Sequence, residues 1–109
     1  MNFEYDPEKN EINKERHGFE LIASIPVFFD EYRIEAYDFE HSAVEDRYIT
    51  IGRVKTANLK EELFVVYTER NDNVRLISAR LATDFERRLY ENGGGYYKGA
   101  EWERVFPDA

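Results

Sequence analysis

The chain has 109 residues, of which 15 are Lys or Arg and 23 are Asp or Glu, so its formal net charge is −8. Its hydrophobic fraction of 42% and its aromatic fraction of 16% exceed those of a disordered chain and predict one folded domain with a real core. The absence of cysteine excludes a disulfide scaffold, a thiolate zinc site and a cysteine nucleophile.

The N-terminal residues show no targeting pattern. They lack a basic stretch followed by an apolar run, as a secretory signal has. No apolar segment approaches the roughly 18 residues that are needed to span a bilayer. We therefore expect a cytoplasmic protein that does not bind a membrane.

The charge is uneven along the chain. Residues 1–46 hold 4 basic and 13 acidic side chains, whereas residues 47–90 hold 9 basic and 6 acidic ones, and 7 of those 9 are Arg. An acidic protein is normally a poor ligand for a polyanion, but Arg binds phosphate or carboxylate through two parallel hydrogen bonds. The central block is where we expect anion-binding residues, although a solvated charged surface is the simpler interpretation for most of them.

The first predicted element is a helix over residues 7–17. Asp6 is a suitable N-cap and Gly18 a suitable C-terminal stop. Lys9 and His17 are eight residues apart with Asn13 between them, so all three share one helix face.

An apolar segment and four strand-like runs follow. Residues 19–25 predict a short buried helix that Pro26 ends or kinks. The later runs are separated by short polar segments, which is typical of an antiparallel meander. The strands are expected at 33–37, 46–52, 62–69 and 74–80, and the separators at 39–42, 54–58 and 70–73.

The third separator predicts a tight hairpin, because Asn and Asp tolerate positive φ. With a two-residue turn at 71–72, the register places 67 opposite 76, 66 opposite 77 and 64 opposite 79. One face of the hairpin is then apolar, and we expect a site on the other. The apolar face carries Phe64, Val66, Ile77 and Ala79; the other carries Tyr67, Glu69, Ser78 and Arg80 among Leu63, Val65 and Leu76.

Beyond the sheet, Thr83 and Glu86 form a capping box that opens a last helix. Residues 92–95 read as a flexible glycine break, and four aromatic residues follow it. These aromatic side chains either pack back onto the domain or cover a neighbouring molecule. We divide the chain into a single domain over 1–90 and a Gly-rich break with an aromatic tail over 91–109.

The order of several short motifs resembles the BrnT family of type II toxins, from about residue 3 to residue 90. The resemblance implies a toxin domain of RelE-like fold, a ribonuclease activity that blocks translation, and neutralisation by a BrnA antitoxin with a ribbon-helix-helix DNA-binding domain. The motifs are Glu4-Tyr5-Asp6-Pro7-x-Lys9, Asn13-x-x-Arg16-His17-Gly18, Arg47-x-x-x-Ile51-Gly52-Arg53, Val66-Tyr67-Thr68-Glu69-Arg70, Arg75-x-Ile77-Ser78-Ala79-Arg80 and Glu86-Arg87-x-x-Tyr90.

We therefore expect an α+β fold with N-terminal helices, a four-stranded antiparallel sheet and a C-terminal helix, in a RelE-like arrangement. RNA cleavage without a metal or other cofactor needs a base for the 2′-hydroxyl proton, an acid for the 5′-oxygen and cations for the phosphate. The catalytic candidates are Arg53, Glu69, Arg80 and His17, and the RNA-binding candidates are Lys9, Tyr67, Arg75 and Arg70.

Three of the catalytic candidates, His17, Glu69 and Arg80, also have a structural interpretation. His17 precedes a helix-ending glycine, where an imidazolium favours the helix dipole. Glu69 is adjacent to Arg70 and forms an edge ion pair in the simplest interpretation, while Arg80 is as well placed for a salt bridge to Glu86 or Glu69 as for phosphate.

His41 lies near Glu40, Glu45 and Asp46 and invites a metal interpretation. The cluster contains a single histidine, and its spacing is that of a flexible loop. A solvated loop is therefore the favoured interpretation.

Two functions remain open. The first is an endoribonuclease toxin whose Arg-bearing face cleaves RNA and is covered by its antitoxin. The second is a non-catalytic binding module or co-repressor for a ribbon-helix-helix antitoxin. A positive patch made by Arg53, Arg75 and Arg80 favours the first, and arginines that are all paired with carboxylates favour the second. The chain is expected as a homodimer or as a hetero-oligomer with the antitoxin.

Overall fold

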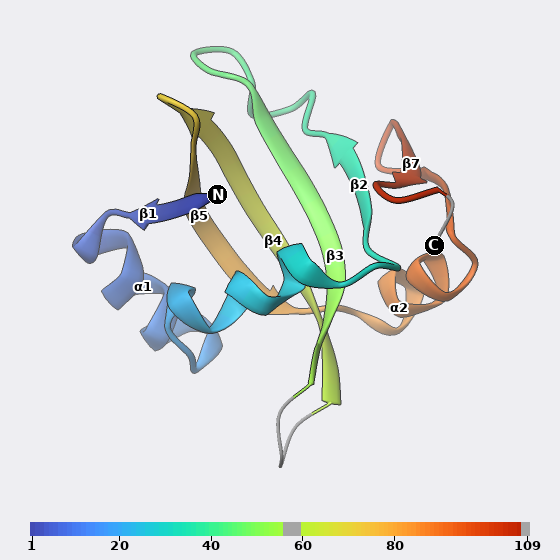
Figure 1. Ribbon diagram of the computed structural model, residues 1–109, viewed down its shortest axis with the longest axis horizontal. Helices are drawn as coiled ribbons and strands as arrows, with labels where there is room; N and C mark the ends of the chain where they lie inside the picture. The colour runs from blue at the N-terminus through green and yellow to red at the C-terminus, as the bar shows by residue number, and fades with distance from the viewer. Residues whose placement is uncertain (56–59, 108–109) are drawn as a thin grey trace.

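The computed structural model describes residues 1–55 and 60–107. Within them, seven strands form one mixed sheet in the order β1-β5-β4-β3-β2-β7-β6 (Figure 1). The strands are β1 Asn2–Tyr5, β2 Ile34–Tyr37, β3 Arg47–Lys55, β4 Lys60–Arg70, β5 Asn73–Leu81, β6 Gly94–Tyr97 and β7 Ala100–Arg104; the helices are α1 Pro7–His17, the 3₁₀ helix η1 Leu21–Phe29, and α2 Asp84–Glu91.

The two faces of the sheet carry separate apolar clusters. Helix η1 crosses one face (Figure 1), where Leu21, Val27 and Phe28 pack with residues such as Val65. We call this the η1 face. On the other, the α2 face, Leu89 and Tyr90 of α2 pack with Ile34, Ile51, Phe64 and Trp102 of the strands. A functional side chain therefore lies on one face, on the other, or at an edge.

The expected fold class is wrong. The sheet is not four-stranded and antiparallel with a RelE-like arrangement: β1 pairs with β5 in parallel, and the β6–β7 hairpin pairs with β2. Strand β1 has only four residues, and its partner lies about 70 residues further along the chain. A parallel partner at that separation leaves no turn signal in the sequence.

Helix α1 agrees with the prediction, and η1 does not. Asp6 caps α1 by accepting a hydrogen bond from Glu8 N, and Gly18 closes it at φ 84°. Pro26 was expected to end or kink the next helix, but it lies inside η1, which continues to Phe29. A 3₁₀ helix is held by i to i+3 hydrogen bonds. Pro26 has no backbone N–H, so its presence inside η1 removes only one hydrogen-bond donor.

The four predicted strands are all present, as β2 to β5. A loop was expected over residues 54–58, but residues 54 and 55 are the last two residues of β3. Residues 56–58 lie outside the described residues.

The hairpin turn at Asn71 and Asp72 is confirmed, with both residues at positive φ. The predicted register holds only next to the turn. Tyr67 faces Leu76 as expected, but a β-bulge shifts the pairs beyond it, so that 66 faces 78 and 64 faces 80. The bulge moves Ser78 and Arg80 to the α2 face, opposite to the face of Tyr67. The predicted polar face is therefore split between the two sides of the sheet.

The aromatic tail packs back onto the sheet as β6 and β7, with Trp102 buried against Phe64. The glycines that read as a flexible break begin β6. A Cβ at Gly94 would overlap the carbonyl oxygen of Trp102, and the φ of Gly94, 119°, is one that other residues rarely adopt. Glycine at this position lets the two strands of the hairpin approach each other.

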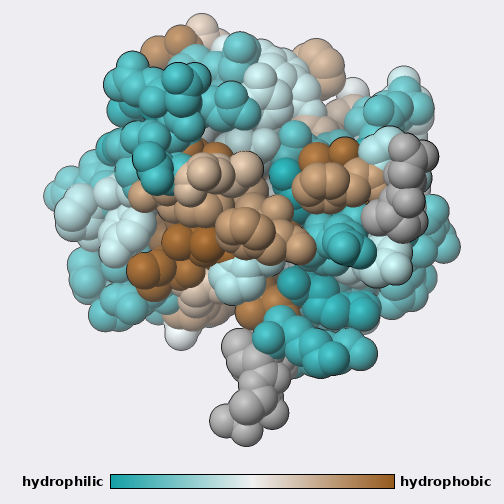
Figure 2. Space-filling view, viewed as in Figure 1, coloured by the Kyte–Doolittle hydropathy of each residue, from teal (hydrophilic) through white to brown (hydrophobic). Residues whose placement is uncertain are grey.

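Figure 2 shows apolar surface gathered over the middle of the η1 face. Ile22 and Phe29 of η1 are exposed there, and Phe29 contacts Phe3 of β1. In the described part of the chain, no helix has the length and the apolar character that crossing a membrane requires.

Candidate functional site

The four arginines that the sequence singled out are all paired with carboxylates. Arg53, Arg75 and Arg80 lie on the α2 face of the middle strands, and Arg70 lies next to the hairpin turn. In each pair a guanidinium nitrogen lies 2.8 to 3.2 Å from a Glu oxygen. The pairs are Arg53–Glu62, Arg70–Glu45, Arg75–Glu4 and Arg80–Glu86.

Arg80 and Glu86 make the most extensively bonded of these pairs. Two guanidinium nitrogens of Arg80 donate to the two carboxylate oxygens of Glu86 at 2.8 and 2.9 Å, and the side chain of Glu86 is fully buried. Burial raises the pKa of Glu86, but hydrogen bonds from Arg80 and Thr83 N outweigh it and bring the pKa to about 2. Glu86 also completes the predicted capping box of α2, so both structural interpretations of Arg80 and Glu86 hold.

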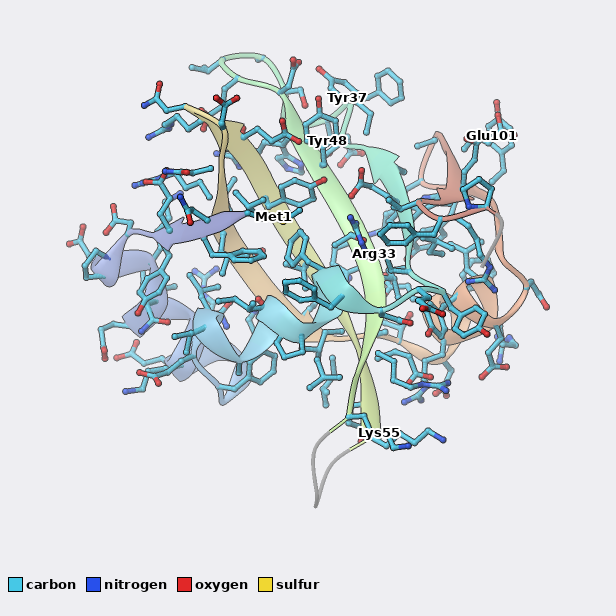
Figure 3. The ribbon with its side chains drawn as sticks, viewed as in Figure 1. Met1, Arg33, Tyr37, Tyr48, Lys55 and Glu101 are labelled. Carbon is cyan, nitrogen blue, oxygen red and sulfur yellow. The ribbon has the colours of Figure 1, made fainter. Side chains whose placement is uncertain are left out.

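Tyr67 lies on the η1 face and is buried. Its hydroxyl donates to Glu35 at 2.6 Å, and Glu35 in turn accepts from Arg33 at 2.9 Å. Burial and the adjacent Glu35 raise the pKa of the Tyr67 hydroxyl. Figure 3 shows Arg33 near the centre of this face, with Tyr48 beyond it toward the upper end of the sheet; Tyr48 stacks on Tyr67. This geometry fits a structural network better than a surface that stacks RNA bases.

The predicted site residues are not brought together. Glu69 is exposed at the end of β4 on the same face as Tyr67, whereas Arg53, Arg75 and Arg80 lie on the opposite face. Lys9 and His17 lie beyond the sheet edge on α1 and share one cavity, as their helix spacing predicts. The eight predicted residues therefore do not meet in one place. Their roles in catalysis and RNA binding stay predictions.

A cavity of about 250 Å³ on the α2 face contains a different set of polar groups. His41, in the loop after β2, has its ring Nδ1 at 3.0 and 3.1 Å from the two carboxylate oxygens of Asp38. Asp38 is buried, while 60% of the His41 side chain is exposed. A carboxylate only accepts hydrogen bonds at neutral pH, so Nδ1 carries the proton and Nε2 of a neutral ring is free to accept one.

We call this the His41 cavity. Two cations, Arg47 and Lys98, share it with His41. Arg47 begins β3, and Lys98 lies in the turn of the β6–β7 hairpin. Within the described residues neither forms an ion pair, and the Arg47 Nε is buried without a hydrogen-bond partner. Aromatic walls complete the cavity, contributed by Tyr37, Phe39, Phe64, Tyr97 and Trp102.

His41 stands out in the sequence, but its partners do not. The acidic residues near it that suggest a metal site are Glu40, Glu45 and Asp46, whereas the carboxylate that holds the ring is Asp38, three residues before His41. Local spacing shows that Asp38 and His41 can meet, but the inward position of Arg47 depends on the β2–β3 turn, where Ser42 accepts from Arg47 N. Among residues 1–55 and 60–107, no three His, Asp or Glu side chains gather as metal ligands do.

A second cavity, of about the same volume, lies between α1 and the outer edge of β5. It contains Lys9, Arg16 and His17 from the helix and Ser78 from the strand. Helix α1 is fixed against this edge by Asn13, whose side-chain oxygen accepts from Ala79 N at 3.0 Å. Within residues 1–55 and 60–107, the His41 cavity and this second cavity thus both contain available cations, and both adjoin β5.

The His41 cavity of this α+β protein thus brings together cations, a carboxylate-bound histidine and aromatic residues. A family model, described as the ribonuclease toxin BrnT of type II toxin-antitoxin systems, matches residues 5–86. The match covers most of the chain, which therefore belongs to the BrnT family; such a toxin has an antitoxin partner and an RNA substrate. No curated protein matches the sequence.

Proposed function

We propose that the protein is an endoribonuclease that cleaves single-stranded RNA in the His41 cavity without a metal ion. The observation that carries this proposal is the His41–Asp38 pair beside Arg47, a cation that pairs with no carboxylate in the described part of the chain. The family supplies the reaction class, and the cavity supplies groups for each part of it except an assigned acid.

The reaction follows from these groups. Nε2 of His41 takes the proton of a ribose 2′-hydroxyl, and the 2′-oxygen attacks the adjacent phosphorus. Asp38 holds the ring and stabilises the imidazolium as it forms, while Arg47 donates to the phosphate oxygens as negative charge develops on them. The bond to the 5′-oxygen breaks, and solvent reaching this exposed site supplies its proton. The products are a 2′,3′-cyclic phosphate and a 5′-hydroxyl end.

The aromatic walls favour single-stranded RNA as the substrate. Phe39 is exposed beside Tyr37, with their ring centroids 4.8 Å apart. Unpaired bases stack on such rings, whereas the bases of a duplex are not accessible to them. Cleavage of messenger RNA in the cytoplasm would block translation.

The test compares purified wild-type protein with His41→Ala and Arg47→Ala on a single-stranded RNA, with and without EDTA. We expect His41→Ala to lower kcat at least about 100-fold, because general-base catalysis contributes that much. Arg88→Ala is the matched control, since Arg88 is exposed on α2 and does not line the cavity. Full activity of His41→Ala, or loss of wild-type activity in EDTA, would overturn the proposal.

The arginine pairs give a specific reason to keep a second candidate. Arg53, Arg75 and Arg80 are each bound by a glutamate, which is the arrangement expected of a non-catalytic antitoxin-binding module. The same experiment separates the two functions: a wild-type protein that binds its antitoxin and leaves RNA intact supports the module.

We further propose that the partner is a BrnA-like antitoxin with a ribbon-helix-helix domain. Residues 1–46 carry a large acidic excess, which attracts a basic partner. The exposed apolar surface over η1 lies within this acidic part of the chain and offers side chains for the partner to bury (Figure 2).

A further inference from the structure

The cavity between α1 and β5 has the chemistry of a second anion site. Its basic side chains are Lys9, Arg16 and His17, and Asn13 and Ser78 add polar side chains. No Asp or Glu of the described residues lines it, although the protein has a formal net charge of −8.

The helix period explains how the charges are separated. Successive side chains turn by about 100°, so residues 9, 12, 13 and 16 share one side of α1 and residue 17 lies next to them. Glu11 lies on the opposite side of the helix, Glu8 and Glu15 lie on its flank, and none of the three lines the cavity. The acidic residues of α1 therefore leave the cations on its other side unneutralised.

These cations also differ from Lys14 on the same helix. Lys14 lies 3.7 Å from Glu11 and 3.8 Å from Glu20, whereas neither Lys9 nor Arg16 forms an ion pair with any described residue. Arg16 and His17 stand in the last turn of α1, where cations favour the helix dipole. Lys9 is in the first turn, so the dipole does not explain its presence in the cavity.

The two cavities adjoin each other across β5. Ile77 and Ser78 line both. Strand β1 covers the outer edge of β5 only from Asn73 to Leu76, so β1 does not extend between the cavities at Ile77 and Ser78. An extended chain that occupies the His41 cavity can continue over this bulged part of β5 to α1.

We infer that Lys9, Arg16 and His17 form a phosphate subsite that holds the RNA strand next to the nucleotide bound in the His41 cavity. This inference rests on the proposed function, because it assigns a path to the same substrate. Lys9 and Arg16 each bind one backbone phosphate and contact no base edge, so the subsite adds affinity without sequence preference.

The test measures binding in the His41→Ala background, by fluorescence anisotropy, with a single-stranded RNA whose 2′-hydroxyls are methylated. Each phosphate contact on a single strand contributes about −0.7 to the slope of log K against log salt. We expect Lys9→Ala/Arg16→Ala to make the slope less steep by about 1.4 and to weaken binding roughly tenfold at moderate salt. Lys14→Ala is the matched control on the same helix, and it should change neither quantity.

The Tm of the double variant is measured by thermal unfolding. If Lys9 and Arg16 had a purely structural role, their replacement would lower Tm and leave the salt slope unchanged. An unchanged slope and affinity in the double variant would overturn the subsite, as would a loss of antitoxin binding with RNA binding intact. A failure of the proposed RNA cleavage gives a different result from a failure of the subsite. If the wild-type protein cleaves no RNA but the double variant still flattens the salt slope, the subsite stands and the proposed cleavage is wrong.

Discussion

Two groups of basic residues in this protein have opposite surroundings. The arginines in the middle of the sheet, Arg53, Arg75 and Arg80, each form an ion pair with a glutamate. Arg47 at the start of β3 and Arg16 at the end of α1 line cavities and pair with no carboxylate in the described part of the chain. The sequence alone does not distinguish these five arginines. Only the first three form ion pairs that link parts of the fold. Which arginine is available to phosphate depends on its neighbours in space.

The largest contrast is expected between Arg80→Ala and Arg47→Ala in urea unfolding. Arg80→Ala leaves Glu86 buried without its cation and should lower the free energy of unfolding by about 3 to 5 kcal/mol. Arg47→Ala leaves no carboxylate unpaired and should lower it by less than about 1 kcal/mol. Equal losses in the two variants would contradict the division into structural and available arginines.

The pH dependence of stability should report the same pair. The pKa of Glu86 in the folded protein, about 2, lies below its value in the unfolded chain, so the stabilisation is present above about pH 4.5 and is lost as pH falls toward 2. A shift of this size corresponds to about 2 to 3 kcal/mol over that range.

Glu86→Gln is the variant that isolates this effect, because Gln keeps the size of the side chain and its place in the capping box. Its free energy of unfolding should fall less steeply between pH 5 and pH 2 than that of the wild type. Parallel curves for the two proteins would show that other carboxylates cause the acid sensitivity.

The parts of the fold that the sequence predicts correctly are specified by neighbouring residues. The Asp6 cap, the capping box at Thr83 and the turn at Asn71 each depend on contacts within a few residues. Strand β1 depends on a partner strand about 70 residues further along the chain, and the bulge near Tyr67 depends on how β4 and β5 pair. Neither leaves a periodic signal, so the register was wrong beyond the bulge and the sheet was expected to be too small.

The candidate site divides in the same way. Lys9 and His17 were placed on one helix face by spacing alone, and the structure confirms that they share a cavity. The sequence favours a solvated loop for His41; the catalytic role proposed above depends on the burial of Asp38 and on Arg47 lining the same cavity, and spacing alone reveals neither. Residue types and spacing can propose a face, but burial and pairing decide which side chains on it are free to react.

The smallest expected effect comes from Glu4→Gln, which releases Arg75 from its ion pair between β1 and β5. The pair is partly exposed, so its loss should lower the free energy of unfolding by less than about 1 kcal/mol. Arg75 lines neither cavity, and we therefore expect RNA affinity, measured by anisotropy, to change less than about twofold. A steeper salt slope in Glu4→Gln, by about 0.7, would mean that RNA reaches Arg75 once it is unpaired. Whether an arginine binds RNA would then depend on whether it is free of an ion pair, and not on whether it lines one of the two cavities.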